Sequence, residues 1–361
     1  MANIGMPKID VIFKGLAVSA IQRSAKGIVV LIVKEPTADF DFAEYKTVDQ
    51  IEEDKFTAAN VAYIKDVFVG NPSRVIVATQ KDAELLSAVL LKVKTKFFNW
   101  IGLAEGTQQE QDDLATWIKS VNQNEKKVYK TITYNATVTD DMHIVNFANE
   151  TLKPKNKDEI TGEKYIARLL GLFAGLPFTQ SATYYIMQDL ESVTEPADLE
   201  TAVNAGKLIL FNDEFNYEPV VRVARAINSL ITVAQPLTDD MKKITIVEAM
   251  DLMQTDISST FKNFYIGKYK NVYDNQVLFL SAINSYFRQL ALESILDQNF
   301  ANLSDINVEK QRLAWLGIGK TEAETWTDLQ VKINTFRSNL LLAGKVKILD
   351  AMEDLDFTIN M

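Results

Sequence analysis

Ile28-Val29-Val30-Leu31-Ile32-Val33 is a continuous apolar run in which every residue except Leu31 is β-branched. Such a run is typical of a strand buried on both faces, as in a parallel sheet with helices on either side. A strand with one face in water would instead alternate apolar and polar residues. The run therefore predicts a central strand of a mostly parallel sheet.

Helical and strand patterns alternate at regular spacing after this run. Asp82 is expected to cap one of the helices, and Thr107 with Glu110 forms a capping-box pattern at the start of the next. Strands joined through helices in this way require right-handed crossovers and lie parallel in one sheet. Helices are predicted over residues 57–70, 82–93, 107–121, 158–177 and 199–205, and strands over 74–78, 97–103, 128–133, 144–147, 182–186 and 208–211.

The pattern changes after Pro236, where two long amphipathic helices are predicted, over residues 246–264 and 277–296. The last eighteen residues again have an extended pattern. The predicted fold class is therefore α/β plus α+β: a domain with a mostly parallel sheet, a second domain with long helices, and extended termini.

The composition excludes several kinds of protein. The 361 residues carry a net charge of −10, with one histidine and no cysteine. Zinc sites, disulfides and thiol nucleophiles need cysteine or several histidines, so we expect no metal and no cofactor. A net-acidic chain is poorly suited to binding DNA or RNA. No segment reaches the roughly 20 apolar residues of a membrane helix, and we expect neither membrane insertion nor a secretory signal.

The alternating strands and helices are also typical of nucleotide-binding enzymes, so such an enzyme is an alternative interpretation. Phosphate binding needs glycine-rich turns after strands, and none of the predicted turns holds two glycines. The segment Gly317-Ile318-Gly319-Lys320-Thr321 is similar to the end of a P-loop, but Ala314 stands where the motif needs its first glycine. We interpret this segment as a turn that ends a helix, and His143 as a structural or surface residue.

A basic cluster stands out in the acidic chain. Lys262, Lys268 and Lys270 are interleaved with phenylalanine and tyrosine residues. The cluster is either a docking patch for an acidic partner protein or the ordinary cationic end of a helix. The sequence favours neither interpretation.

Both termini alternate apolar and polar residues, as in strands with one apolar face. Ile9, Val11 and Phe13 form such a face near the N-terminus, and Leu355, Phe357 and Ile359 form one near the C-terminus. A terminal strand either joins its own sheet or adds to the sheet of a neighbouring subunit. The free energy gained by burying one arm nearly equals the conformational entropy cost of ordering it. A single exchanged strand would therefore bind weakly, and only a polymer with many such contacts would be stable. From the residues alone, pairing with its own sheet is the favoured interpretation, and strand addition to a neighbouring subunit is the alternative.

The chain resembles contractile tail sheath proteins of phages and phage-derived bacteriocins, in the short form common in Gram-positive bacteria and their defective prophages. The resemblance covers nearly the whole chain and comes from a set of stretches rather than from one signature. The sequence lacks the inserted domains of large phage sheaths, and a glycine would be expected near Ser294. The stretches are Met6–Val33, AGLPFTQSATYYIM (Ala174–Met187), RVARAINSL (Arg222–Leu230), Ile246–Phe287 and VKILDAMEDLDFTINM (Val346–Met361).

The resemblance implies a mechanical role without enzymatic activity. Sheath subunits form homo-hexameric rings stacked helically around a tail tube, and their terminal arms add strands to neighbouring subunits. When the sheath contracts, it drives the tube through the envelope of the target cell. The implied partners are further copies of the chain, the tail tube protein, and baseplate and tail terminator proteins. The implied location is a virion tail or bacteriocin particle, assembled in the cytoplasm of the bacterial host.

The resemblance also assigns roles to the segments. Ile9, Val11 and Phe13 belong to the N-terminal arm, Leu355, Phe357 and Ile359 to the C-terminal arm, and the lysines at 262, 268 and 270 to a surface that faces the tube. Another tail or baseplate component is the remaining alternative, although a tube protein should be smaller and barrel-like. The implied domains are an N-terminal arm (1–22), an α/β domain (23–235), a tube-facing domain (236–342), and a C-terminal strand and arm (343–361).

Overall fold

The computed structural model describes residues 20–23, 26–214 and 219–360. The chain forms two compact units, and the boundary between them falls inside helix α6 (Ile244–Thr260). Of the described residues, those within 24–253 and 348–361 form the sheet unit, and those within 1–23 and 254–347 form the helical unit. The limits of these two units differ from those of the domains expected from the sequence. The expected domain limits stay predictions.

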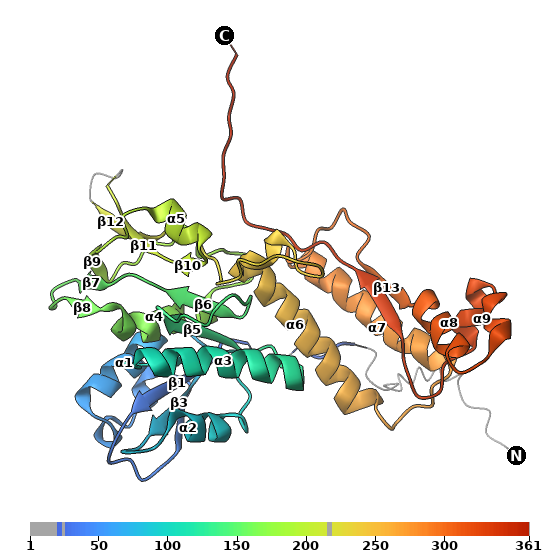
Figure 1. Cartoon of the computed structure of the whole chain (residues 1–361), viewed down its shortest axis with the longest axis horizontal. Coiled ribbons are helices and arrows are strands. Elements are labelled where there is room, and N and C mark those ends of the chain that lie inside the picture. Colours follow the sequence, from blue (N-terminus) through green and yellow to red (C-terminus); the bar gives the residue numbers. More distant parts are fainter. Residues whose placement is uncertain (1–19, 24–25, 215–218, 361) are drawn as a thin grey trace, which may run out of the picture. The chain divides into compact units, whose positions relative to one another are not determined.

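The sheet unit is built on a seven-stranded sheet of order β10-β6-β5-β4-β1-β3-β2. Figure 1 labels β1, β3, β5, β6 and β10 of this sheet. All neighbouring strands are parallel except β2, which runs antiparallel to β3 at one edge. The mostly parallel sheet predicted from the sequence is confirmed. Its strands are β1 (Ile28–Lys34), β2 (Phe42–Tyr45), β3 (Arg74–Gln80), β4 (Trp100–Leu103), β5 (Lys130–Tyr134), β6 (Ile144–Phe147) and β10 (Lys207–Leu208).

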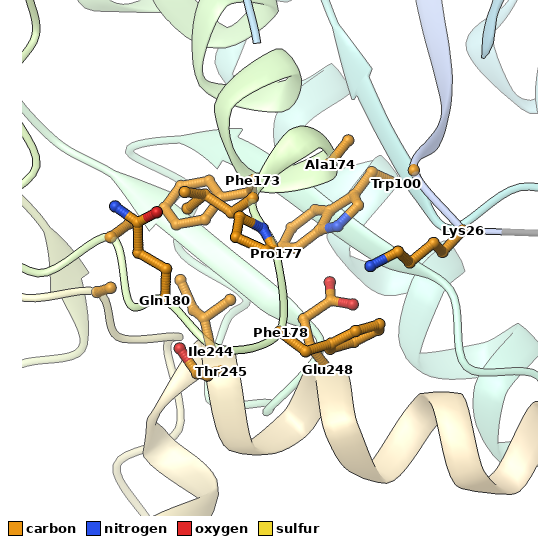
Figure 2. Close-up of a pocket in the computed structure, with 14 residues that line it drawn as sticks. Lys26, Trp100, Phe173, Ala174, Pro177, Phe178, Gln180, Ile244, Thr245 and Glu248 are labelled. Atoms are coloured by element: carbon orange, nitrogen blue, oxygen red, sulfur yellow. The ribbon is translucent and has the colours of Figure 1, made fainter. Parts of the chain in front are cut away.

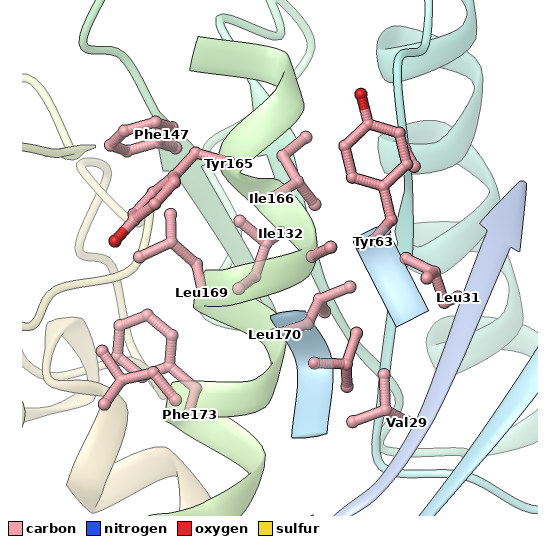
Figure 3. Packing of buried hydrophobic residues seen from close by; sticks show 14 of the residues in the cluster. Val29, Leu31, Tyr63, Ile132, Phe147, Tyr165, Ile166, Leu169, Leu170 and Phe173 are labelled. Atoms are coloured by element: carbon pink, nitrogen blue, oxygen red, sulfur yellow. The ribbon is translucent and has the colours of Figure 1, made fainter. Parts of the chain in front are cut away.

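Strand β1 is buried on both faces, as its composition predicts. Val29, Leu31 and Val33 belong to one hydrophobic core cluster, and the alternate residues of the strand belong to a second. Helices α1 (Ala58–Phe68) and α4 (Ile166–Gly175) supply the first cluster, and α2 (Leu86–Val93) and α3 (Gln108–Glu125) the second. Figure 3 shows the apolar side chains of α4 against those of β1.

Glycines bring α1 and α4 into backbone contact. A Cβ added to Gly171 would lie 2.1 Å from the carbonyl oxygen of Val67, and one added to Gly70 would lie 2.0 Å from that of Gly171. No real Cβ fits at such distances, so these positions need glycine for the close approach.

Two small sheets complete this unit. They are an antiparallel sheet of order β8-β7-β9 and an antiparallel pair of β11 and β12. Their strands are β7 (Thr151–Pro154), β8 (Ile160–Thr161), β9 (Leu190–Val193), β11 (Leu210–Asp213) and β12 (Val220–Val223), and the short helix α5 spans Leu199–Asn204.

Three local predictions in this unit are wrong. The helix predicted over 158–177 starts late, because residues 160–161 form β8 and α4 begins only at Ile166. Asp82 does not cap α2, because Ala83 adopts a left-handed φ of 58° and the helix begins only after Leu85. The predicted strand at 182–186 is not formed, because Tyr184 also has a positive φ of 59° and only an isolated bridge at Ile186 remains. The predicted capping box of Thr107 and Glu110 is confirmed.

The helical unit contains the rest of α6, a π-helical turn η5 (Phe261–Tyr265), and helix α7 (Tyr273–Leu292). The helix predicted over 246–264 is therefore α-helical as far as Thr260 and continues as the π-helical turn to Tyr265. The helix predicted over 277–296 begins and ends four residues earlier, at Tyr273 and Leu292. Strands β13 (Leu303–Ile306) and β14 (Leu342–Lys345) pair antiparallel, with α8 (Val308–Leu316) and α9 (Asp328–Ile333) between them in the sequence. Gly317 ends α8, which confirms that the P-loop-like segment is a helix-ending turn.

Candidate assembly surfaces

The C-terminal segment exposes the apolar residues that the sequence singled out. Leu355, Phe357 and Ile359 are 90%, 73% and 69% exposed. Residues 355–360 pair with no strand in the part of the chain that the structure describes, and Figure 1 draws them as an extended segment. The strand predicted for 354–361 is therefore not formed within the single chain, because nothing on the described chain covers its apolar face. An uncovered apolar stripe of this kind marks a surface for contact with another molecule.

The predicted N-terminal arm cannot be placed in the same way. Ile9, Val11 and Phe13 lie outside the described residues.

One edge of the β13–β14 pair is closed by a side chain. The Asn284 amide of α7 donates to the carbonyl oxygen of Ser304 at 3.1 Å, and its Oδ1 accepts from the Ser304 N–H at 2.7 Å. Asn284 thus occupies the place of a neighbouring strand on β13.

The other edge of this pair, along β14, is open. Ser304 turns its backbone groups away from β14, so it forms a non-hydrogen-bonded pair with Gly344 opposite. The N–H and C=O groups of Gly344, and of Leu342 two residues earlier, therefore point outward. Among the described residues, nothing bonds to them. Such an edge can accept a further strand.

The three predicted lysines lie together on the helical unit. Lys262 belongs to η5, and Lys268 and Lys270 follow it; all three are exposed. Lys268 Nζ donates to the carbonyl oxygen of Asn263 at 2.5 Å and lies 5.6 Å from the centroid of the Phe264 ring. Over the described ranges none of the three lysines forms an ion pair, so their charges are available to a partner.

An aromatic groove adjoins these lysines. Its volume is about 640 Å³, and Phe261, Tyr265, Tyr269 and Phe279 line it. Lys270 also contributes to the lining. The Tyr265 and Phe279 rings lie 4.6 Å apart between centroids. The surface thus combines apolar rings with positive charge that is not ion paired among the described residues, which suits a partner segment with apolar and acidic side chains.

At the carboxyl edge of the large sheet, where a nucleotide would bind in an open α/β fold, carboxylates of the protein occupy the starts of two helices. Glu35, directly after β1, accepts from the N–H of Thr57 and from the Asn60 amide, both at 2.8 Å, at the start of α1. Glu110 caps the start of α3 and pairs with Lys34 at 2.7 Å. Carboxylates thus stand where helix N-termini would hold a phosphate.

A pocket in the sheet unit is too small for a substrate. It lies between Trp100, Phe173, Phe178 and Glu248 and has a volume of about 30 Å³ (Figure 2). Ligand sites usually measure about 300–1,000 Å³. The pocket has room for about one water molecule.

His143 is a buried structural residue, as one of the interpretations from the sequence had it. Its Nε2 lies 3.0 Å from Oδ1 of Asp251 on α6, and its Nδ1 lies 3.4 Å from Asp141. No serine or other nucleophile among the described residues bonds to the ring.

Known proteins resemble this chain over its full length. The tail sheath protein of Clostridium phage phiCD119 is 33% identical over 99% of this chain and 99% of its own. The chain belongs to the phage tail sheath family. Residues 238–361 also match the family of phage tail sheath C-terminal domains.

Solved structures share the fold of this sheath subunit. The helical sheath of the anti-feeding prophage in its contracted state has a TM-score of 0.69 at 11% identity, with 99% of both chains covered. A sheath tail protein from Listeria innocua has a TM-score of 0.66 at 12% identity, covering 80% of this chain and 90% of its own. The subunit is thus a structural component of the tail sheath of a phage or another contractile particle. Among the described residues, none of the helices has the length and the apolar composition that a membrane span requires.

Two features of these surfaces could not be predicted from the sequence. One is the capping of β13 by Asn284, and the other is a cluster of ion pairs around Glu353. Neither has a signal in the sequence, because each joins residues that only the fold brings together. The acidic residues between 350 and 354 were visible, but their basic partners at 225 and 243 lie more than a hundred positions away.

Proposed function

We propose that this sheath subunit forms homo-hexameric rings that stack helically around a tail tube, and that the sheath contracts to drive the tube through the target envelope. Membership of the sheath family supports the proposal, and the relative from the anti-feeding prophage was solved as a helical sheath in its contracted state. The work is mechanical in this proposal, and the subunit has no catalytic role.

The exposed C-terminal arm is the observation that carries the proposal. Leu355, Phe357 and Ile359 leave three large apolar side chains in water. Their burial would contribute roughly 1.5–3 kcal/mol each. Ordering the arm costs a similar amount, so a single link is weak and a polymer of many links is stable. The arm therefore links neighbouring subunits rather than stabilising its own.

The edge of β14 is the acceptor that we propose for such an arm. Leu342 and Gly344 present outward backbone groups to an incoming strand, whereas Asn284 blocks the opposite edge of the pair. Lys345, at the end of β14, is exposed and forms no ion pair among the described residues. The N-terminal arm, with Ile9, Val11 and Phe13, supplies a second link of the same kind.

The lysine surface is our candidate for tube attachment. Lys262, Lys268 and Lys270 are exposed and not ion paired within the described ranges, and the aromatic groove lies beside them. Baseplate and tail terminator proteins are the further partners that we infer for the two ends of the sheath. We propose that the finished particle is a virion tail or a bacteriocin and that it is assembled in the host cytoplasm.

Negative-stain electron microscopy of purified variants tests the arm. Changing Leu355, Phe357 and Ile359 together to serine should leave a folded subunit that forms no tubules. Changing Asp356, Thr358 and Asn360 to serine alters the other face of the same segment and should permit assembly. Tubules from the first variant would contradict the proposed C-terminal arm.

A further inference from the structure

The segment just before the exposed arm is tightly bonded to the sheet unit through Glu353. Its side chain is only 5% exposed. Oε1 of Glu353 accepts from the hydroxyls of Ser181 at 2.8 Å and Thr183 at 2.7 Å. Oε2 lies 3.3 Å from Lys243 Nζ and 3.7 Å from Arg225 Nε. A carboxylate placed in this way is held by both hydrogen bonds and charge.

The same two cations hold the acidic residues on either side. Lys243 also pairs with Asp350. Arg225 donates from Nη2 to both carboxylate oxygens of Asp354, at 2.6 and 2.5 Å. Two basic side chains therefore bind three carboxylates spaced over five residues. A network of this kind costs less side-chain entropy per contact than separate surface pairs, which are worth about 0–1 kcal/mol each.

The bonding stops at Asp354. Met352, within the bonded segment, turns its side chain fully into solvent. After Asp354, no described residue bonds to residues 355–360. The chain thus changes from fixed to free over a single peptide unit, at the first residue of the apolar stripe.

We propose that this cluster is an electrostatic anchor that fixes the root of the C-terminal arm, so that only the residues after Asp354 are available for exchange. Its role rests on the proposed arm exchange, but the anchor itself is a property of one subunit. Release of residues 348–354 would lengthen the free tether by about 23 Å when extended, at about 3.3 Å per residue. A longer tether lowers the effective concentration of the arm at its acceptor. The anchor therefore sets the reach of the arm.

The absence of cysteine from the sequence permits a direct test by spin labelling. Labels are placed at Leu91→Cys on α2 and Met352→Cys, two exposed positions, in the full-length chain diluted with unlabelled protein. Double electron–electron resonance should give a narrow distance distribution at 0.1 M NaCl. Asp350→Asn with Glu353→Gln should broaden it at least twofold, whereas Asp356→Asn, beyond the anchor, should leave it unchanged.

A second double variant controls for misfolding that the change of the buried Glu353 could cause. Arg225→Gln with Asp354→Asn leaves Glu353 in place and should also broaden the distribution, as should 1 M NaCl, where the Debye length falls from about 10 to about 3 Å. An unchanged narrow distribution in both double variants would overturn the anchor. A narrow distribution that responds as expected, in a chain that forms no tubules, would support the anchor and contradict the arm exchange instead.

Discussion

Nε2 of His143 lies 3.0 Å from Oδ1 of Asp251, and both side chains are buried. The other carboxylate oxygen of Asp251 accepts from Lys130 Nζ at 2.7 Å, while Asp141 lies 3.4 Å from Nδ1 of His143. Glu248 lies 3.4 Å from Lys130 Nζ. The beginning of α6 is thus joined to β5 and to the turn before β6 by a buried network of charges. Removing one partner of such a network leaves an uncompensated charge.

This network makes the stability of the sheet unit depend on pH. Burial alone would lower the pKa of His143, but the carboxylates of Asp251 and Asp141 outweigh it and raise the pKa to about 9. The unfolded chain has a histidine pKa of about 6.5. A raised pKa stabilises the folded state fully below about pH 6.5, and this contribution is lost as pH rises through about 9, with a total of about 3 kcal/mol.

Urea unfolding between pH 6 and 9.5 checks this expectation. The free energy of unfolding of the unaltered protein should fall over this range, and that of His143→Gln should stay flatter while being lower at pH 6. Equal pH dependence in the two proteins would show that His143 does not carry the charge assigned to it.

Because α1 and α4 are in backbone contact, adding one methyl group at Gly171 should strongly lower the free energy of unfolding. Gly171→Ala would place a Cβ 2.1 Å from the carbonyl oxygen of Val67, so one helix must shift. We expect a loss of about 3 kcal/mol in the free energy of unfolding. Gly317→Ala is the matched control, because its Cβ would come no closer than 3.2 Å to a neighbour and its φ of −63° suits alanine. Thermal unfolding that ranks the two variants equally would contradict the close packing.

The elements that could be predicted from the sequence are those whose burial leaves a regular apolar pattern. Ile28–Val33 is apolar throughout because both faces of β1 are covered, so composition alone indicates its place. The start of α2 was not predictable, because the left-handed φ of Ala83 depends on the surrounding turn and no residue type there requires it. The same holds for the assembly surfaces: the apolar stripe of the arm is visible in the sequence, whereas the Asn284 cap depends on a contact between distant elements.

The end of α7 explains why a glycine would be expected near Ser294. The N–H of Ile295 bonds to the carbonyl of Leu290 at 2.9 Å and that of Ser294 to Ala291 at 3.0 Å, which is the Schellman pattern. Ser294 takes the left-handed position of this pattern, with a φ of 58°. This conformation costs a side-chain-bearing residue roughly 1–2 kcal/mol.

Ser294→Gly should therefore stabilise the helical unit. After allowance for the greater freedom of glycine in the unfolded chain, we expect a gain of about 0.5–1 kcal/mol, measured as a higher urea midpoint. Ser294→Ala keeps the strain and should give no gain. A lower midpoint for the glycine variant would contradict the strain assigned to Ser294.

The open edge of β14 yields a variant that blocks strand addition without changing the subunit. Gly344→Pro removes an N–H that points away from β13, so the β13–β14 pair should persist while an incoming strand loses one hydrogen bond and meets the proline ring. Gly344→Ala adds the same Cβ, 3.2 Å from its nearest neighbour, but keeps the N–H. Electron microscopy should show tubules for the alanine variant and few or none for the proline variant, with unchanged circular dichroism. Tubules of equal number and length from both would remove β14 as the acceptor.

The proposed roles of the lysine surface and of arm exchange can be tested separately, because the two surfaces bind different partners. Lys262, Lys268 and Lys270 changed together to glutamate reverse the charge beside the aromatic groove, and co-assembly with the tail tube protein should weaken at least tenfold in pull-downs. The sheath-on-sheath tubules should still form, because the exposed lysines lie apart from β14 in the sequence and support none of its hydrogen bonds. Lys46, Lys155 and Lys157 are lysines of the sheet unit, and changing them to glutamate alters the net charge equally. If the control variant weakens binding to the tube as much as the first variant does, only overall charge matters. If the first variant abolishes the sheath tubules that form without a tube, the surface joins sheath subunits instead.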